Sequence, residues 1–192
     1  MKILYVDCET TGLNAYKNGI IQLAGIIEIN NKQMVEFDIK MKPFKDDIIE
    51  EKALQVSGIT EKDIEKFQSA ESGYNKIIQI FDTYINKYDK NDKFIICGYN
   101  VKFDVDFLKQ FFIKNGNKFL FSYFGGIKDL FLVIRYLSSL GKIQTKNKQL
   151  GTVCEHFGIE LKDAHNAMAD IIATKKLAEK IDELFNDIKI KK

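Results

Sequence analysis

The sequence has few cysteines and no long apolar run, and each absence excludes a class of protein. The three cysteines, Cys8, Cys97 and Cys154, are widely spaced in apolar surroundings. This pattern favours reduced, buried thiols over a disulfide framework or a zinc cluster. No apolar stretch approaches the roughly 20 residues that a membrane-spanning helix needs. With 45% apolar and 29% charged residues, the composition is that of a globular protein with no membrane association.

Proline, repeats and a leader segment are also scarce or absent. Pro43 is the only proline, and no internal repeat or low-complexity tract interrupts the 192 residues. This length fits one domain, which we expect to span 1–192, with a core at about 1–186 and a short basic C-terminal tail. Met1-Lys2 leads directly into a strand-like run, leaving no room for a signal peptide. We therefore expect a cytoplasmic protein.

Arginine is almost absent, because Arg135 is the only one, and the net charge is +2. A weakly positive chain holds nucleic acid poorly by its own field, and one guanidinium excludes bidentate base recognition as a main device. Lysines or a bound metal would have to hold any polyanion. The most basic loop, 141–148, is either a path for a phosphate chain or a solvated lysine loop.

Apolar periodicity predicts a mixed α/β sheet. Runs rich in β-branched residues predict five strands, at 2–6, 20–29, 33–40, 93–100 and 119–129. Helical composition or spacing predicts helices at 46–60, 70–88, 129–140, 148–157 and 167–186, and one more that carries Phe103, Phe107, Leu108 and Phe111. In the helix at 70–88, the apolar stripe is Ile77, Ile78, Phe81, Ile85 and Tyr88. A hairpin followed by alternating strands and helices indicates a mixed sheet with helices packed on it.

Two acids, Asp7 and Glu9, follow the first apolar run. Strand side chains alternate between faces, so both carboxylates point the same way and Cys8 points the other way into apolar cover. Two carboxylates so close repel each other unless a cation or strong donors offset their charge. Alone, an Asp-x-Glu pair is weak evidence, because a solvated strand end accommodates acids without any function.

Further acids occupy positions from which they can reach this pair. Asp104 follows the strand at 93–100 where a helix should begin, at the rim where open α/β sheets build their sites. The alternative is that Asp104 only stabilises the helix N-terminus. Asp106 lies about 200° further around the helix, so we select Asp104.

The last helix supplies the other candidates. His165 and Asp170 converge only if the histidine lies in the loop before that helix, which is consistent with Asn166 as the N-cap. His156 is interpreted as an ordinary polar residue.

Three segments carry a family resemblance: DCETTGL at 7–13, NVKFDVDFL at 100–108 and HNAMAD at 165–170. They resemble the three motifs of the DEDDh exonucleases, the superfamily of the proofreading epsilon subunit of bacterial DNA polymerase. The segment QVSGIT at 55–60 is also similar to the proofreading members, and the resemblance extends from Met1 to about residue 178. It implies a ribonuclease H-like fold with helices on both faces of a five-stranded sheet.

The resemblance also implies roles for individual residues. It makes Asp7, Glu9, Asp104 and Asp170 catalytic metal ligands and His165 the catalytic general base. It assigns substrate binding to Thr10, Thr11, Gly12, Leu13, Asn100 and Phe103. For Leu13 the alternative is an ordinary apolar cap over the sheet. For Gly12 we expect a backbone conformation closed to other residues.

Carboxylate oxygens suit Mg²⁺ or Mn²⁺ better than zinc. Two such ions, about 3.5–4 Å apart, can clamp the attacking and leaving oxygens of a phosphodiester, with Asp7 shared between them. His165 would take the proton from the attacking water.

The expected function is 3′→5′ hydrolysis of single-stranded DNA with release of nucleoside 5′-monophosphates, in proofreading or repair. RNA trimming or oligoribonucleotide degradation is the alternative within the family, because contacts to the 2′-hydroxyl depend on pocket shape. A degenerate nucleic-acid-binding module is the non-enzyme alternative. An aspartic protease is excluded, because Asp7 is followed by Cys-Glu rather than Thr-Gly. Expected partners are single-stranded DNA or RNA 3′ ends and a DNA polymerase in trans. The oligomeric state is open, since an outer strand can join two copies.

Overall fold

Five strands form one mixed sheet in the order β3-β2-β1-β4-β5 in the computed structural model, which describes residues 1–161 and 166–186. The strands are β1 (Lys2–Thr10), β2 (Ile20–Ile29), β3 (Lys32–Lys40), β4 (Phe94–Gly98) and β5 (Phe124–Asp129). β2 is antiparallel to β1 and β3, whereas β4 is parallel to β1 and β5. At the β2–β3 hairpin, Asn30 and Asn31 both have positive φ, which suits a tight two-residue turn. The five-stranded mixed sheet that the sequence predicts is confirmed.

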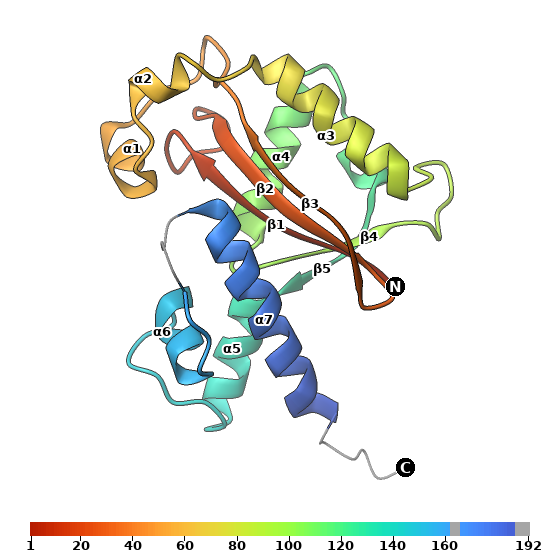
Figure 1. Cartoon of the computed structure of the whole chain (residues 1–192), viewed down its shortest axis with the longest axis vertical. Coiled ribbons are helices and arrows are strands. Elements are labelled where there is room, and N and C mark those ends of the chain that lie inside the picture. The colour runs from red at the N-terminus through yellow and green to blue at the C-terminus, as the bar shows by residue number, and fades with distance from the viewer. Residues whose placement is uncertain (162–165, 187–192) are drawn as a thin grey trace.

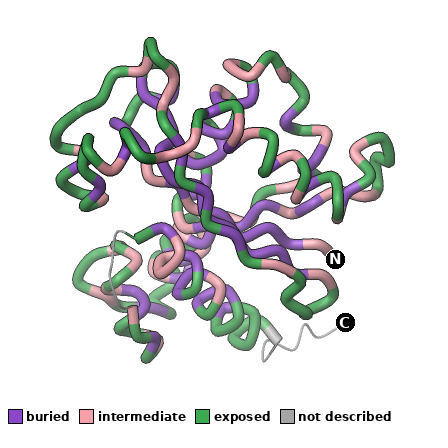
Figure 2. The backbone as a smooth tube through the Cα atoms, turned by 45° about the horizontal axis from the view of Figure 1, so that its top comes forward, coloured by how far each residue is buried: buried purple, intermediate pink, exposed green. Residues whose placement is uncertain are grey.

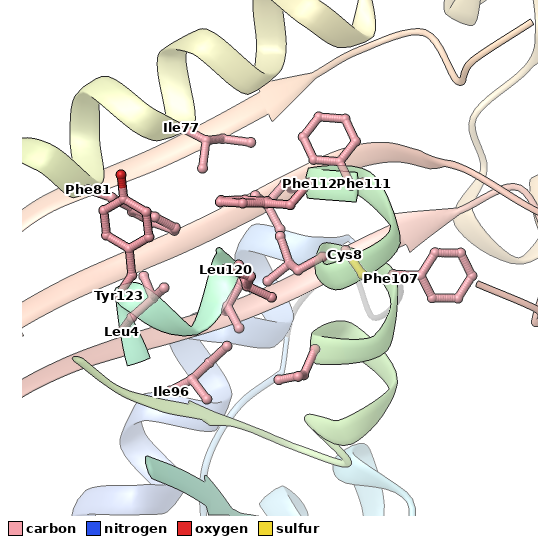
Figure 3. Close-up of a cluster of buried hydrophobic side chains, with 14 of the residues drawn as sticks. Leu4, Cys8, Ile77, Phe81, Ile96, Phe107, Phe111, Phe112, Leu120 and Tyr123 are labelled. Atoms are coloured by element: carbon pink, nitrogen blue, oxygen red, sulfur yellow. The ribbon is translucent and has the colours of Figure 1, made fainter. Parts of the chain in front are cut away.

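Helices cover both faces of this sheet (Figure 1). They are α1 (Glu51–Ser57), α2 (Glu61–Ile64), α3 (Ala70–Tyr84), α4 (Lys102–Lys114), the 3₁₀ turn η1 (Leu120–Ser122), α5 (Leu130–Ser139), α6 (Leu150–His156) and α7 (Ala167–Asn186). α3 and α4 enclose a core with Leu4 of β1, and Figure 3 shows part of this cluster. α5, α6 and α7 enclose another core with Tyr5, the next residue of the same strand. Figure 2 shows the central strands buried between these layers.

The described cysteines are free and buried, as the sequence predicts. Among the helices of the described residues, none is both long and apolar enough to span a bilayer.

Four boundaries differ from the sequence prediction. The strand predicted at 119–129 begins only at Phe124, because Leu120–Ser122 form the 3₁₀ turn η1. β1 continues to Thr10 instead of ending at residue 6, because β2 keeps pairing with residues 7–10 whatever their side chains. The segment 46–60 contains only the short helix α1. The residues before this helix form a loop, in which the Glu50 N–H donates to the Thr11 carbonyl at 2.8 Å. α3 ends at Tyr84, so Tyr88, 89% exposed, is not part of its apolar stripe.

Two irregularities of β1 prepare the site. The β1–β4 ladder pairs only residues 3–5 with 95–97, so the two strands part beyond Tyr5. On the other side of β1, a bulge shifts the β2 register between Glu9 and Thr10. Bulges redirect side chains and are common next to active sites. The last residues of β1 therefore stand free of β4 and open toward the start of α4.

Candidate active site

Asp7 and Glu9 lie on one side of β1 and are half-buried, while Cys8 between them is buried. Cys8 packs into the core on the α3 and α4 side (Figure 3). The alternation along the strand therefore places both carboxylates away from that core, as the sequence predicts.

Asp104 reaches the acid pair through the gap between β1 and β4. It lies in the first turn of α4, its side chain is buried, and its Oδ1 accepts hydrogen bonds from the Cys8 N–H at 3.0 Å and the Cys8 Sγ–H at 3.1 Å. The carboxylate thus satisfies a backbone donor of β1 where β4 no longer pairs with it. Asp106 points to solvent and forms an ion pair with Lys102 at 2.5 Å. The structure brings Asp104, not Asp106, to the pair.

Asp170 approaches from the first turn of α7. Asn166 caps this helix, because its Oδ1 accepts the N–H groups of Met168 at 3.2 Å and Ala169 at 3.4 Å. The negative charge of Asp170 raises the pKa of both Asp7 and Glu9. His165 lies outside the described residues, and its place in the site stays a prediction.

The charges of the other acids raise the pKa values of Asp7 and Glu9. Burial, and then the charges of Asp104, Glu9 and Asp170, hold the pKa of Asp7 well above its usual range. Burial and the charges of Asp170 and Asp104 raise the pKa of Glu9 to about 7. Burial likewise raises the pKa of Asp104 to about 7, although the hydrogen bonds from Cys8 oppose the shift. Asp7, whose pKa responds to all three other acids, is central in this four-acid cluster.

The four-acid cluster, Asp7, Glu9, Asp104 and Asp170, has the chemistry of a divalent-cation site. No ion pair between described residues involves Asp7, Glu9 or Asp104, so no described lysine or arginine neutralises them. Carboxylate oxygens are the ligands that Mg²⁺ and Mn²⁺ prefer. Among the described residues, no three ligating side chains already stand as a metal cage.

Hydrogen bonds of buried side chains hold the turn after β1 in place. The fully buried Thr11 donates its hydroxyl to the Ile48 carbonyl at 2.7 Å and accepts the Gly19 N–H at 2.9 Å. The buried Asn18 amide donates to the same Ile48 carbonyl at 2.8 Å and to Glu50 Oε1 at 3.1 Å. Because the Thr11 hydroxyl is used within the chain, its side chain supports the turn rather than facing a substrate.

Gly12 is required for a reason other than the predicted one. Its φ is not in the left-handed range, so backbone strain is not what selects glycine here. A Cβ at Gly12 would lie 2.3 Å from Asn18 Nδ2 and 2.4 Å from Glu50 Oε1. Close packing of the turn therefore excludes a side chain.

Leu13 and Thr10 lie on either side of this turn, and they differ in their exposure and contacts. Leu13 is 83% exposed, so the alternative of an apolar cap over the sheet is wrong. The Thr10 hydroxyl donates to the Gly12 carbonyl at 2.7 Å. A large apolar side chain held in solvent, four residues after Glu9, is available to contact a ligand.

Asn100 and Phe103 lie between β4 and α4. Asn100 is exposed with φ +63°, and its N–H donates to Asp129 Oδ1 at 3.0 Å. The half-buried Phe103 ring packs 4.8 Å from the Phe107 ring, centroid to centroid. Both residues therefore border the start of α4, where Asp104 lies.

Sequence reasoning missed two supporting residues. Cys8 was interpreted only as core, because nothing in the sequence indicates that its thiol reaches a residue 96 positions away. Asp129 caps α5 by accepting the Phe131 N–H at 3.0 Å, and the same Oδ1 holds Asn100. An acid directly before an apolar helix is an N-cap signal that was available at Asp129.

The order of the five strands and the helices on both faces define a ribonuclease H-like α/β fold, with four acids from three distant segments at one end of β1. A model of the RNase_T exonuclease family matches residues 4–178. The chain belongs to this exonuclease family, and the family resemblance of the three motifs is confirmed.

Curated relatives are much longer than this chain. DNA polymerase III PolC-type of Halalkalibacterium halodurans is 29% identical over 172 residues, which cover 88% of this chain and 10% of the polymerase. The corresponding polymerase of Mycoplasmopsis pulmonis is 33% identical over 116 residues, covering 59% of this chain and 7% of the polymerase. The chain therefore spans about a tenth of the length of these relatives.

The fold matches solved exonuclease structures. E. coli exonuclease I in complex with a dT13 oligonucleotide superposes with a TM-score of 0.81 at 24% identity, covering 96% of this chain and 42% of that one. A second exonuclease I structure, with product bound, has a TM-score of 0.78 at 23% identity and covers 96% and 46% of the two chains. At such identities the likeness is evidence of the fold.

Proposed function

We propose that this chain is a divalent-metal-dependent 3′→5′ exonuclease that shortens single-stranded DNA and releases nucleoside 5′-monophosphates. The observation that carries the proposal is the four-acid cluster at one end of β1, where the charges of neighbouring members raise the pKa values of Asp7 and Glu9. Maintaining such repulsion is costly unless a cation offsets it, so a purely structural role does not account for the cluster. The dT13 oligonucleotide in the complex of E. coli exonuclease I, the structural relative, supports DNA as the first choice.

In this proposal the four acids bind metal ions together, and Cys8 and His165 assist them. Asp7, Glu9, Asp104 and Asp170 would hold two Mg²⁺ or Mn²⁺ ions, with Asp7 shared, since its pKa is affected by the other three. Bound metal ions of this kind stabilise the attacking and leaving oxygens of a phosphodiester. Cys8 keeps one Asp104 oxygen directed toward β1. His165 is proposed as the base that takes the proton from the attacking water, on its sequence motif alone.

The turn after β1 and the start of α4 would hold the terminal nucleotide. The exposed Leu13 can pack against its base, Thr10 and Gly12 belong to the same turn, and Asn100 and Phe103 border the start of α4, where Asp104 lies. The PolC-type relatives carry the matching region within a polymerase. We propose that this chain likewise acts beside a DNA polymerase, as a separate partner.

The test is digestion of matched single-stranded DNA and RNA, labelled at the 5′ end, during titration with Mg²⁺ or Mn²⁺. We expect stepwise shortening from the 3′ end, faster on DNA, and mononucleotide products. Asp7→Ala should abolish the metal-dependent activity while its circular dichroism spectrum stays that of the parent. Faster digestion of the RNA would indicate an RNA-trimming enzyme instead.

A matched control uses an acid outside the cluster. Asp106 is two residues from Asp104 but is exposed and paired with Lys102, so Asp106→Ala should digest DNA at the parental rate. Full activity in Asp7→Ala, or equal loss in both variants, would contradict the assignment of the cluster.

A further inference from the structure

The strand β5 forms an edge of the sheet that is open to another chain. It is the last strand in the sheet order, and no strand of the described residues pairs with its outer side (Figure 1). Its first four residues, FGGI, carry no charge. Its last two residues are engaged within the chain, because Lys128 pairs with Asp182 at 2.7 Å and Asp129 accepts the Asn100 N–H. Such an edge presents unpaired N–H and C=O groups to any extended chain.

The other edge strand, β3, is protected by charge. Its exposed residues include Lys32, Glu36, Asp38 and Lys40. Charged side chains along an edge disfavour pairing with another chain. The sheet therefore protects one edge and leaves the other bare, as expected if only β5 has a partner.

An apolar groove of about 230 Å³ lies beside the bare edge, between β5, η1 and α4. This β5 groove is lined by Val105, Phe121, Phe124 and Ile127, among others, with Gly125 and Gly126. Its volume is below the roughly 300–1,000 Å³ of small-molecule sites, and it suits a single large apolar side chain. None of the described side chains that line it is polar, so a nucleic-acid base would find no side-chain hydrogen bond there.

Apolar side chains are exposed around the β5 groove. Phe119 is 74% exposed, Phe121 53% and Ile127 54%. Grouped apolar residues of this kind mark interaction surfaces. Glycine within a strand often marks a place where another backbone approaches closely. A bare strand edge with a pocket for one side chain is the arrangement that binds an extended peptide as an added strand.

The charge around the β5 groove is positive. The segment 107–128 contains four lysines and no acidic residue, although the net charge of the whole chain is only +2. Lys109, one helical turn after Val105, and Lys118 are both exposed, and neither forms an ion pair with a described residue. This charge favours an acidic partner. A second copy would bring like charges together, and residues 187–192, with three lysines and one acid, have the wrong sign.

We propose that β5 and the β5 groove bind an extended acidic segment of a partner protein, which adds a strand to the sheet. One large apolar side chain of the segment fills the groove, and Asp or Glu residues beside it lie near Lys109 and Lys118. This surface is separate from the four-acid cluster, because Asp104 of α4 reaches the cluster whereas the next residue, Val105, lines the groove.

The experiment selects peptides on the full chain and then maps where they bind. The probe is a phage-displayed random library of peptides of about ten residues, the length of one strand. We expect the selected peptides to carry a large apolar residue flanked by an excess of Asp and Glu. Added to the protein, they should slow amide hydrogen exchange within 124–128, because an added strand bonds to the main chain of β5.

Two matched variants test the location. Ile127→Lys places a charge at the groove on the bare edge, and the exposed side chain can change without loss of folding. The selected peptides should bind it about tenfold more weakly by fluorescence anisotropy, the effect of losing a central interface side chain. Met34→Lys makes the same change at an exposed apolar residue of the protected edge β3 and should bind the peptides as the parent does.

Several results would overturn the proposal. They are a selection without enrichment, selected peptides that are neutral or basic, and equal affinity for the parent and Ile127→Lys. Slowed exchange within 124–128 on addition of oligothymidylate would instead assign the surface to nucleic acid. A dimer in analytical ultracentrifugation that Ile127→Lys abolishes would assign it to a second copy. Absence of nuclease activity would overturn the proposed function and leave this inference unaffected.

Discussion

Burial is the main cause that raises the pKa values of both Glu9 and Asp104 to about 7, and only the further contributions differ. Glu9 is raised by burial and by the charges of Asp170 and Asp104. Asp104 is more deeply buried, but hydrogen bonds from the Cys8 thiol and N–H stabilise its charged form and limit the shift. At neutral pH both carboxyls are therefore close to half-protonated without a cation.

These pKa values predict how the metal-free protein responds to pH. The pKa of Glu9 rises from its ordinary value of 4.5 to about 7 on folding. The folded state therefore binds more protons between these values, so the free energy of unfolding should fall as pH rises from about 4.5 to 7. Glu9→Gln removes this titration and should lose less stability over that range. The measurement is thermal unfolding of both proteins in EDTA at pH 4.5, 6 and 7.5.

The comparison of Glu9→Gln with the parent cancels the effect of ionisable groups that do not interact with Glu9. The pKa of Asp7, which the charge of Glu9 raises, falls in the variant and changes the stability in the same direction. The melting temperatures of the two proteins should draw apart with rising pH, in favour of the variant. A constant difference across the range would show that Glu9 titrates normally.

At the scale of elements, the turn after β1 depends on a segment that lies outside the sheet. Residues 47–50 lead into α1 and supply the Ile48 carbonyl and the Glu50 side chain that hold Thr11 and Asn18. Lys114 of α4 forms an ion pair with Asp47, which fastens the same segment to the helix that carries Asp104. The turn after β1 and Asp104 are thereby fixed to one another.

Close packing predicts the effect of a methyl group at Gly12. A Cβ there would overlap Asn18 and Glu50, so Gly12→Ala should lower the free energy of unfolding by about 1–3 kcal/mol, the usual cost of overpacking. Gly126→Ala is the matched control, because a Cβ at this β5 position meets no heavy atom within 4 Å. Urea denaturation measures both. Equal stability of the two variants would show that the turn adjusts freely.

The elements that periodicity defines were predicted well from sequence, and their ends less well. α7 begins after Asn166 as predicted, because its capping signal is local. The predicted end of α3 was wrong. Tyr88 continues the helical spacing in the sequence, but the Asn86 N–H donates to Asp92 at 2.8 Å instead of continuing the helix. The site acids were predicted from their motifs, whereas the Cys8 thiol bond and the β5 groove depend on tertiary contacts that no local pattern encodes.

At the scale of the whole molecule, one sheet separates two apolar cores that meet different faces of β1. Leu4 belongs to the core with α3 and α4, and Tyr5 to the core with α5, α6 and α7. The acids follow directly on the same strand, and Asp104 and Asp170 come from helices on opposite faces. Assembly of the four-acid cluster therefore requires both layers to be packed. The assignment of 1–192 to a single domain stays a prediction.

Because the cluster joins both layers, divalent metal should stabilise the entire fold. Mn²⁺ or Mg²⁺ would bind the folded protein and not the unfolded chain, which raises the melting temperature. The rise should be larger at pH 8 than at pH 5, since protons compete for Glu9 and Asp104, whose pKa values are about 7. Differential scanning calorimetry with and without Mn²⁺ measures it. An Asp7→Asn variant should show little rise, and equal stabilisation of variant and parent would exclude metal binding at the cluster.

The parting of β1 and β4 beyond Tyr5 makes the spacing between β4 and α4 a determinant of the site. Only residues 99–101 separate Gly98, the end of the strand, from Lys102, the first residue of the helix. Inserting one residue there would turn the helix by about 100° relative to the sheet, bringing Phe103 instead of Asp104 to face Cys8. This connection should tolerate changes of residue type in evolution far better than changes of length.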